Sequence, residues 1–250
     1  MNDTPGYLRP FVVPAPERSA LREGHVDLYL PDGDGPRPAV VLVHGGPLPP
    51  GLEVTPRDWP VFRGYGSLLA SLGVVAATVD HGLGVVAGPD GLVADYPAAH
   101  ELVESAVKAV RADARVDPDR VVLWFFSGGG LLSAVWLRER PEWLRGVALT
   151  YPLLAPVPRF AVDEWFRPAV AVGEPGGVVP PVVLTRVGLE SPELAERVES
   201  FLVAAADAGV AVEVVDVPNG QHSFDVLDDA EESREAVRRV VARVVELLSA

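Results

Sequence analysis

The chain has 250 residues, of which 48% are hydrophobic and 22% are charged, so its composition is that of a globular protein with a sizeable core rather than of a disordered chain. Its formal net charge of -14 argues against a nucleic-acid or anionic-membrane partner, because phosphate groups would be repelled. It contains no cysteine, which excludes disulfides, thiolate metal sites and a cysteine nucleophile.

No targeting or membrane segment is predicted. The N-terminal stretch MNDTPGYLRP lacks a basic region followed by an apolar core, so it does not have the pattern of a signal peptide. No apolar run approaches the roughly 18 residues that a membrane span requires. We therefore expect a soluble protein, cytoplasmic by default.

Apolar runs rich in β-branched residues alternate with helical patterns along the chain. In chain order the sequence predicts strands at 25–30 and 39–43, helix 59–72, strand 74–79, helix 98–114, strand 120–126, helix 128–140, strands at 146–150 and 182–185, helix 191–209, strand 212–217 and a final amphipathic helix over 237–248. Strands that alternate with helices predict βαβ units, and hence an α/β protein with a mostly parallel sheet and helices on both faces.

The patterns also predict how these elements are arranged in the domain. Strand 39–43 is continuously apolar, as a strand buried on both faces should be, whereas strand 25–30 alternates and is predicted at an edge. The tripeptide Asp117-Pro118-Asp119 predicts a break before strand 120–126. We expect one domain over 1–250, in which 1–24 form an N-terminal extension. The proline- and glycine-rich segment 155–181 is predicted to be irregular, with room for a small flap.

The stretch WFFSGGG places Ser127 at the end of the central predicted strand and directly before a helix. In a parallel α/β sheet, the catalytic and ligand-binding residues lie at the carboxyl ends of the strands. Gly128 relieves the crowding of a sharp strand-to-helix turn, and the serine hydroxyl would then project above the sheet as in a nucleophile elbow. The usual pattern, G-x-S-x-G, has a glycine where this chain has Phe125. A capping serine at a glycine-rich helix start is the alternative interpretation.

A second glycine pair follows the buried strand 39–43 in the stretch His44-Gly45-Gly46-Pro47. Glycines at this position let backbone N–H groups approach a bound oxygen closely, so the loop is where an oxyanion hole would receive a donor. We expect a structural rather than a catalytic role for His44.

Two further polar residues follow later strands. His222 lies in NGQHSF, between the last predicted strand and the final helix, and is a candidate general base. Glu190 comes just after strand 182–185, where its carboxylate could orient the imidazole. Two other carboxylates compete for this role: Asp225, which is close to the histidine in sequence, and Glu174 in the irregular segment.

The order Ser127, Glu190, His222 is the chain order of the α/β-hydrolase fold and differs from that of other serine-hydrolase folds. Through HGGP, the serine turn, GLE and GQHSF, the chain resembles α/β-hydrolases, in particular dienelactone-hydrolase-like proteins and small esterases without a large cap domain. The resemblance implies that Ser127 is the nucleophile, His222 the general base and Glu190 the orienting acid. It also implies that Gly46 and Gly128 donate the oxyanion hydrogen bonds.

A small-molecule substrate is the partner that these motifs imply. Pro47, Trp165 and Phe224 suggest an apolar pocket for an acyl compound, although simple packing under a loop explains them equally well. No cofactor is expected. No metal site is expected either, because His81 and the other histidines lack the spacing of metal-ligand motifs.

The resemblance thus implies a serine hydrolase that cleaves a carboxylic ester or thioester through an acyl-enzyme intermediate. A lactonase, a peptidase or an acyl-transferring or cyclising enzyme would use the same residues. A non-catalytic binding protein with a hydrolase fold is the alternative from another class, and Phe125 favours it. The sequence does not indicate the oligomeric state.

Overall fold

A computed structural model describes residues 5–49, 51–88, 91–157 and 162–249. Its centre is an eight-stranded sheet with the order β1-β2-β4-β3-β7-β8-β9-β10, in which β1, β2 and β4 are antiparallel neighbours and all other neighbouring pairs are parallel. The strands are β1 (Leu21–Glu23), β2 (Val26–Tyr29), β3 (Arg37–Val43), β4 (Val75–Val79), β7 (Val116–Phe126), β8 (Leu144–Thr150), β9 (Val182–Val187) and β10 (Val212–Val217). The predicted mostly parallel sheet is therefore confirmed.

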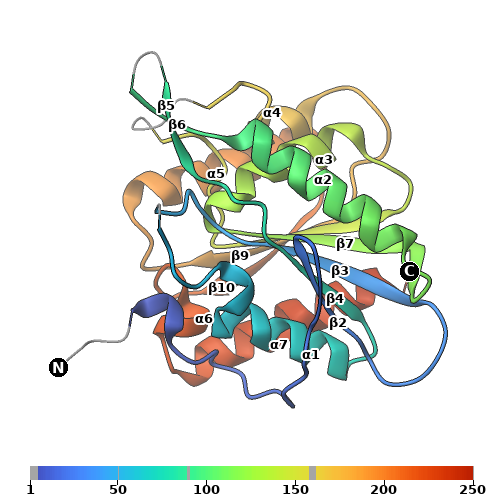
Figure 1. The fold of residues 1–250 in the computed structure, drawn as a ribbon. Coiled ribbons are helices and arrows are strands. Elements are labelled where there is room, and N and C mark those ends of the chain that lie inside the picture. The colour runs from blue at the N-terminus through green and yellow to red at the C-terminus, as the bar shows by residue number, and fades with distance from the viewer. Residues whose placement is uncertain (1–4, 50, 89–90, 158–161, 250) are drawn as a thin grey trace.

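Helices cover both faces of this sheet (Figure 1). On one face lie α2 (Tyr96–Ala112), α3 (Ser133–Glu139), α4 (Pro168–Gly173) and α5 (Pro192–Asp207); on the other lie α1 (Pro60–Ser71), α6 (Phe224–Leu227) and α7 (Glu231–Leu247). Three short 3₁₀ helices, η1 (Gly6–Leu8), η2 (Pro56–Asp58) and η3 (Ser127–Leu132), and a separate hairpin of β5 (Val85–Gly88) and β6 (Gly91–Ala94) complete the elements of the described residues.

The two apolar layers follow from the period-2 alternation of side chains along the strands. At the end of β7, Phe125 is fully buried in the core under α2 and α3, whereas Trp124 and Phe126 are buried in the core against α1 and α7. Phe125, the residue that departs from the usual elbow pattern, thus packs within one core layer.

Three local details differ from the expectations. Strand β2 is not at the edge, because β1 pairs outside it, and all four residues of β2 are buried. The predicted break at Asp117–Asp119 lies within β7, where the pairing with β3 changes register and the Asp119 N–H bonds to the Asp117 carboxylate. The hairpin β5–β6 had no clear signal in the sequence.

The segment before β2 packs closely onto the rest of the chain. Val12 and Val13 are buried, and the Val12 N–H donates to the carbonyl of Asp225. A Cβ on Gly64 of α1 would lie 2.3 Å from the Phe11 ring, so that glycine lets the ring sit against the helix. Of the predicted irregular segment 155–181, the described part contains the single helix α4, and 158–161 lie outside the described residues.

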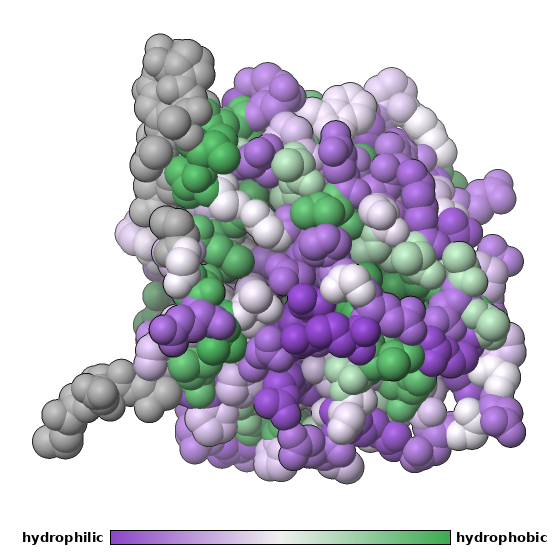
Figure 2. All heavy atoms as spheres, in the orientation of Figure 1, coloured by the Kyte–Doolittle hydropathy of each residue, from purple (hydrophilic) through white to green (hydrophobic). Residues whose placement is uncertain are grey.

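The face shown in Figure 2 carries hydrophilic side chains over most of its area, with apolar ones in small separate patches. None of the helices in the described ranges is both long enough and apolar enough to span a bilayer.

Candidate active site

Ser127 is the turn residue that directly follows β7 and begins η3, with a φ of +48°. A non-glycine residue in this region is strained, and such strain is typical of an elbow that holds its side chain above the sheet. Glycine is required at the two positions that follow, because a Cβ atom there would clash with the backbone of a neighbouring loop. A Cβ on Gly128 would lie 1.8 Å from the carbonyl oxygen of Gly46, and one on Gly129 would lie 2.3 Å from that of His44. The turn therefore packs directly against the loop after β3.

The loops after β9 and β10 lie side by side and bring Glu190 to His222. The Gly188 N–H donates to the Val217 carbonyl, and the Leu189 N–H donates to the Gly220 carbonyl. Because a Cβ on Gly188 would lie 2.0 Å from the Pro218 carbonyl oxygen, glycine is needed where the loops approach.

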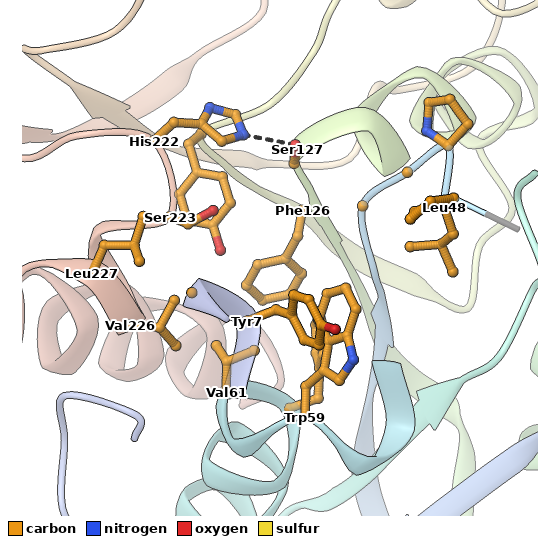
Figure 3. A pocket seen from close by; sticks show the side chains of 17 residues that line it. Tyr7, Leu48, Trp59, Val61, Phe126, Ser127, His222, Ser223, Val226 and Leu227 are labelled. Carbon is orange, nitrogen blue, oxygen red and sulfur yellow. Dashed lines mark hydrogen bonds between the residues drawn. The ribbon is translucent and has the colours of Figure 1, made fainter. Parts of the chain in front are cut away.

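Ser127, His222 and Glu190 form one hydrogen-bonded chain. The Ser127 Oγ lies 2.7 Å from Nε2 of His222 (Figure 3), and His222 Nδ1 lies 2.5 Å from Oε2 of Glu190. The other Glu190 oxygen accepts the Ser191 N–H at 2.8 Å. Burial raises the pKa of Glu190, but the hydrogen bond and charge of His222, together with the Ser191 N–H, outweigh burial and hold that pKa below its usual value. Glu190 is therefore an ionised partner for the imidazole.

The two competing carboxylates have other partners. Glu174 accepts a hydrogen bond from Arg138 at 2.8 Å. Asp225 is fully buried and accepts hydrogen bonds from the hydroxyls of Tyr65, at 3.1 Å, and Tyr151, at 2.9 Å. Of the three candidate carboxylates, only Glu190 is hydrogen-bonded to His222.

Asp225 should make stability depend on pH. Burial raises its pKa to about 6, and the two tyrosine hydrogen bonds offset only part of that rise. A raised folded-state pKa stabilises the fold below the unfolded pKa, and this contribution is lost as the pH rises through the folded pKa. With an unfolded value of 3.8, the free energy of unfolding of the wild type relative to Asp225→Asn should fall by about 2 kcal/mol between pH 4 and pH 7.

Urea unfolding of both proteins at the two pH values measures this difference. A wild-type advantage that instead grows with pH would mean that the tyrosine hydrogen bonds outweigh burial and hold the carboxylate ionised.

Gly46 and Gly128 meet beside the serine. A Cβ on Gly45 would lie 2.9 Å from Cβ of Ser127, and the Gly46 nitrogen is 3.1 Å from the Cβ position of Gly128. In the part of the chain that the structure describes, neither the Gly46 N–H nor the Gly128 N–H donates to a protein acceptor. Two backbone donors are thus free next to the Ser127 hydroxyl.

Two cavities meet at the Ser127–His222 pair. The larger has a volume of about 370 Å³, within the range of small-molecule sites, and its wall is mostly aromatic and aliphatic. Figure 3 shows several of its side chains; the main apolar ones are Tyr7, Trp59, Val61, Phe62, Phe126, Tyr151, Val226 and Leu227. The smaller cavity, of about 170 Å³, is bounded by Tyr96, Leu131, Leu153, Val157, Val162 and Leu194. Pro47, a predicted substrate-binding residue, borders both cavities.

Two of the residues predicted to contact substrate lie elsewhere. Trp165 is 47% exposed and stacks under the Arg138 guanidinium, 4.1 Å from the ring centre, outside the linings of both cavities. Phe224 is fully buried against Tyr151 in the core, and its neighbours in α6 line the cavity in its place. The prediction failed because aromatic character and loop position do not determine which way a side chain points.

Sequence reasoning missed the aromatic wall formed by Tyr7 and Trp59. Their rings stack with centres 4.8 Å apart, so η1 forms part of the larger cavity. The N-terminal segment carried no periodic signal that would have placed it there. The position of Trp59 could have indicated a cavity residue, because it lies directly before Pro60, at the start of α1, in the connection after the HGGP loop.

Among the described residues, no group of three or more histidine, cysteine, aspartate or glutamate side chains is arranged to hold a metal ion. His44 and His81 are both buried and stack with ring centres 3.6 Å apart. Burial lowers the pKa of His44 to about 4 and that of His81 well below its usual value, so both rings are neutral.

The architecture and the position of Ser127 define the α/β-hydrolase fold, in agreement with the resemblance seen in the sequence. The chain matches no family model and no curated protein sequence at a significant level. Solved structures of esterases share its fold.

Esterase 2 of Thermogutta terrifontis, phosphonylated by cyclosarin, superposes with a TM-score of 0.66 at 21% identity, over 90% of this chain and 88% of the esterase. The Pyrobaculum calidifontis esterase gives 0.68 at 22% identity, over 90% and 82%. A mutant form of the esterase rPPE gives 0.67 at 19% identity, over 89% and 78%.

Proposed function

We propose that this protein is a serine hydrolase that cleaves a carboxylic ester or thioester through an acyl-enzyme intermediate. The observation that carries the proposal is the continuous chain from Ser127 Oγ through the His222 imidazole to the Glu190 carboxylate, with contacts of 2.7 and 2.5 Å. The esterase neighbours support it, since all three share the fold. The phosphonylation of one of them indicates that an organophosphonate is a suitable probe.

The reaction begins when His222 Nε2 takes the Ser127 hydroxyl proton as Oγ attacks the acyl carbon. Glu190 holds the ring so that Nδ1 carries its proton and Nε2 can accept one, and it stabilises the imidazolium that forms. The alcohol or thiol then leaves with the proton from His222. A water molecule, deprotonated by the same nitrogen, repeats the attack and releases the acid.

The negative charge on the former carbonyl oxygen is stabilised by the N–H groups of Gly46 and Gly128. Each such donor contributes about 3–4 kcal/mol of transition-state stabilisation, because it is fixed before the charge develops.

The cavities indicate a neutral substrate. Among the residues that the structure describes, neither lining contains an aspartate, glutamate, lysine or arginine, so a charged group on either side of the ester carbonyl would lose its hydration without gaining a partner there. We therefore propose an ester with an apolar group in the larger, aromatic cavity and a smaller apolar group in the other. A substrate that carries its own carboxylate next to the scissile bond does not fit this lining.

Two series of p-nitrophenyl and alkyl esters test the proposal, one varied on the acyl side and one on the alcohol side. We expect Trp59→Ala to lower kcat/KM roughly 10–100-fold for the best substrate of the series whose variable group fills the larger cavity, because the contact of one indole is worth about 1.5–3 kcal/mol. The other series should be unaffected.

Trp165→Ala is the matched control, because that tryptophan lies outside both cavities and should leave both series unchanged. Equal effects of the two tryptophan variants, or no effect of Trp59→Ala in either series, would refute the assignment of the larger cavity to substrate.

The alternative functions are of two kinds: enzymes that act on another acyl compound or use another acyl acceptor, and a binding protein without catalytic activity. A lactone, an amide or an acyl-transfer acceptor would react through the same residues, so a panel of these substrates beside the esters separates the enzymes. For the non-catalytic binding protein, the main support was Phe125 in the elbow. That side chain is buried in the core, and the contact between Ser127 and His222 is kept, so we favour the enzyme.

A further inference from the structure

The loop that carries the Gly46 donor is held at both ends by the segment after β4. At its start, Nε2 of His81 lies 2.9 Å from the carbonyl oxygen of His44. At its end, the Leu48 N–H donates to the Leu83 carbonyl at 2.8 Å. Between these two points, the Leu83 side chain lies 3.0 Å from the Cβ position of Gly46. The loop therefore rests on residues 81–83 along its length.

The hydrogen bonds of His81 define its tautomer. The Leu83 N–H donates to Nδ1 of His81 at 3.3 Å, so this nitrogen carries no proton in the neutral ring. Nε2 must then carry the proton and donate it to the His44 carbonyl. His81 is buried and lines neither cavity, so it acts on the loop and not on a bound molecule.

The His44 ring in turn holds the next carbonyl group of the loop, that of Gly45. Its Nδ1 lies 2.5 Å from the carbonyl oxygen of Gly45, which can only accept, so Nδ1 donates. In a planar trans peptide the N–H points opposite to the C=O. With the Gly45 carbonyl held by the His44 ring, the Gly46 N–H points away from that ring. Gly46 borders both cavities, and its nitrogen lies 3.1 Å from the Cβ position of Gly128, the other expected donor.

We propose that His81 is a positioning residue for the oxyanion hole, which fixes the Gly46 N–H by donating to the His44 carbonyl and stacking on the His44 ring. The inference rests on the proposed function, because the donor matters only if an oxyanion forms at Ser127. Without this hydrogen bond the glycines of the loop are still present, but the His44 carbonyl, where the loop begins, is no longer held in place. A misplaced donor weakens transition-state binding more than substrate binding.

The test is His81→Phe, which keeps an aromatic ring that can stack on His44 but removes both ring nitrogens. We expect kcat for ester hydrolysis to fall about 10–100-fold with KM nearly unchanged. This effect is smaller than that of removing one oxyanion donor altogether, because the Gly46 N–H is misplaced and not lost. The Ki of an n-alkyl trifluoromethyl ketone should rise by the same factor as kcat/KM falls, because its adduct with serine places an oxygen anion in the hole. His81→Gln, whose amide N–H can reach the same carbonyl, should recover most of the activity.

The matched control is His100→Phe, a histidine that packs beside Trp136 and Phe166 and lines neither cavity. It should leave kcat and Ki unchanged. Nitrogen-15 NMR of the wild type provides a readout that requires no variant to fold: His81 should show a protonated Nε2 and an unprotonated Nδ1.

The outcomes separate the two hypotheses. Wild-type hydrolysis that His81→Phe leaves unchanged, or a His81 protonated on Nδ1, overturns the positioning role alone. A fall in kcat that His81→Gln fails to recover also overturns it, since the loss would then come from packing. A folded wild type that hydrolyses no ester contradicts the proposed function, and this inference falls with it.

Discussion

Replacing Ser127 by alanine is expected to lower kcat for ester hydrolysis by about 10⁴-fold or more, with the fold intact. The serine oxygen is the only protein atom in the proposed mechanism that forms a bond to the acyl carbon, and no other hydroxyl of the described residues is hydrogen-bonded to His222 Nε2. Removal of a serine nucleophile leaves only the catalysis due to binding and the oxyanion donors. Steady-state kinetics with a p-nitrophenyl ester measure the loss.

Ser200→Ala provides the control for this variant. Ser200 is an exposed residue of α5 that bonds only to the Glu196 carbonyl of its own helix, so its removal should not affect kcat. If Ser127→Ala kept more than about a tenth of the wild-type rate, the reaction would have to use a different nucleophile.

Replacing Glu190 by glutamine is expected to lower kcat by about 10³–10⁴-fold while KM changes little. Glutamine has almost the same shape, but its neutral amide does not stabilise the imidazolium and can hold the ring in the wrong tautomer. The lowered pKa of Glu190 indicates that the structure stabilises its charged form, which the variant lacks. The pH dependence of kcat/KM and the rate at its plateau measure the effect.

The two other candidate carboxylates serve as comparisons. Glu174→Gln breaks a contact with Arg138 that lies away from His222, so we expect wild-type kinetics. Asp225→Asn removes a charge that two tyrosines hold in the core and should change stability more than kcat. A deep loss of kcat in Asp225→Asn together with wild-type activity in Glu190→Gln would transfer the orienting role to Asp225.

The positions of Ser127, Glu190 and His222 could be predicted because each follows a strand whose pattern is clear in the sequence. In a parallel sheet such residues share one edge, and their order along the chain selects a single known fold. The strand order itself, with β3 and β7 adjacent at the centre, was beyond the pattern, since periodicity shows which segments are strands and not which of them pair.

What the sequence could not provide are contacts between residues far apart in the chain and the directions of single side chains. The stacking of Tyr7 on Trp59 joins the N-terminal segment to the loop before α1, and no local pattern encodes that contact. Trp165 was predicted to face substrate and instead lies against Arg138, because a neighbouring guanidinium offers its ring a partner at the surface. The contact of His81 with the His44 carbonyl is likewise visible only once β3 and β4 are paired.

The most direct test of the central claim is the reaction of the intact protein with a fluorophosphonate, followed by mass spectrometry. The account predicts that one phosphonyl group is added, that it maps to Ser127, and that Ser127→Ala and His222→Ala each abolish or strongly slow its addition. A folded wild type that remains unmodified, or that carries the label on another residue, would contradict it.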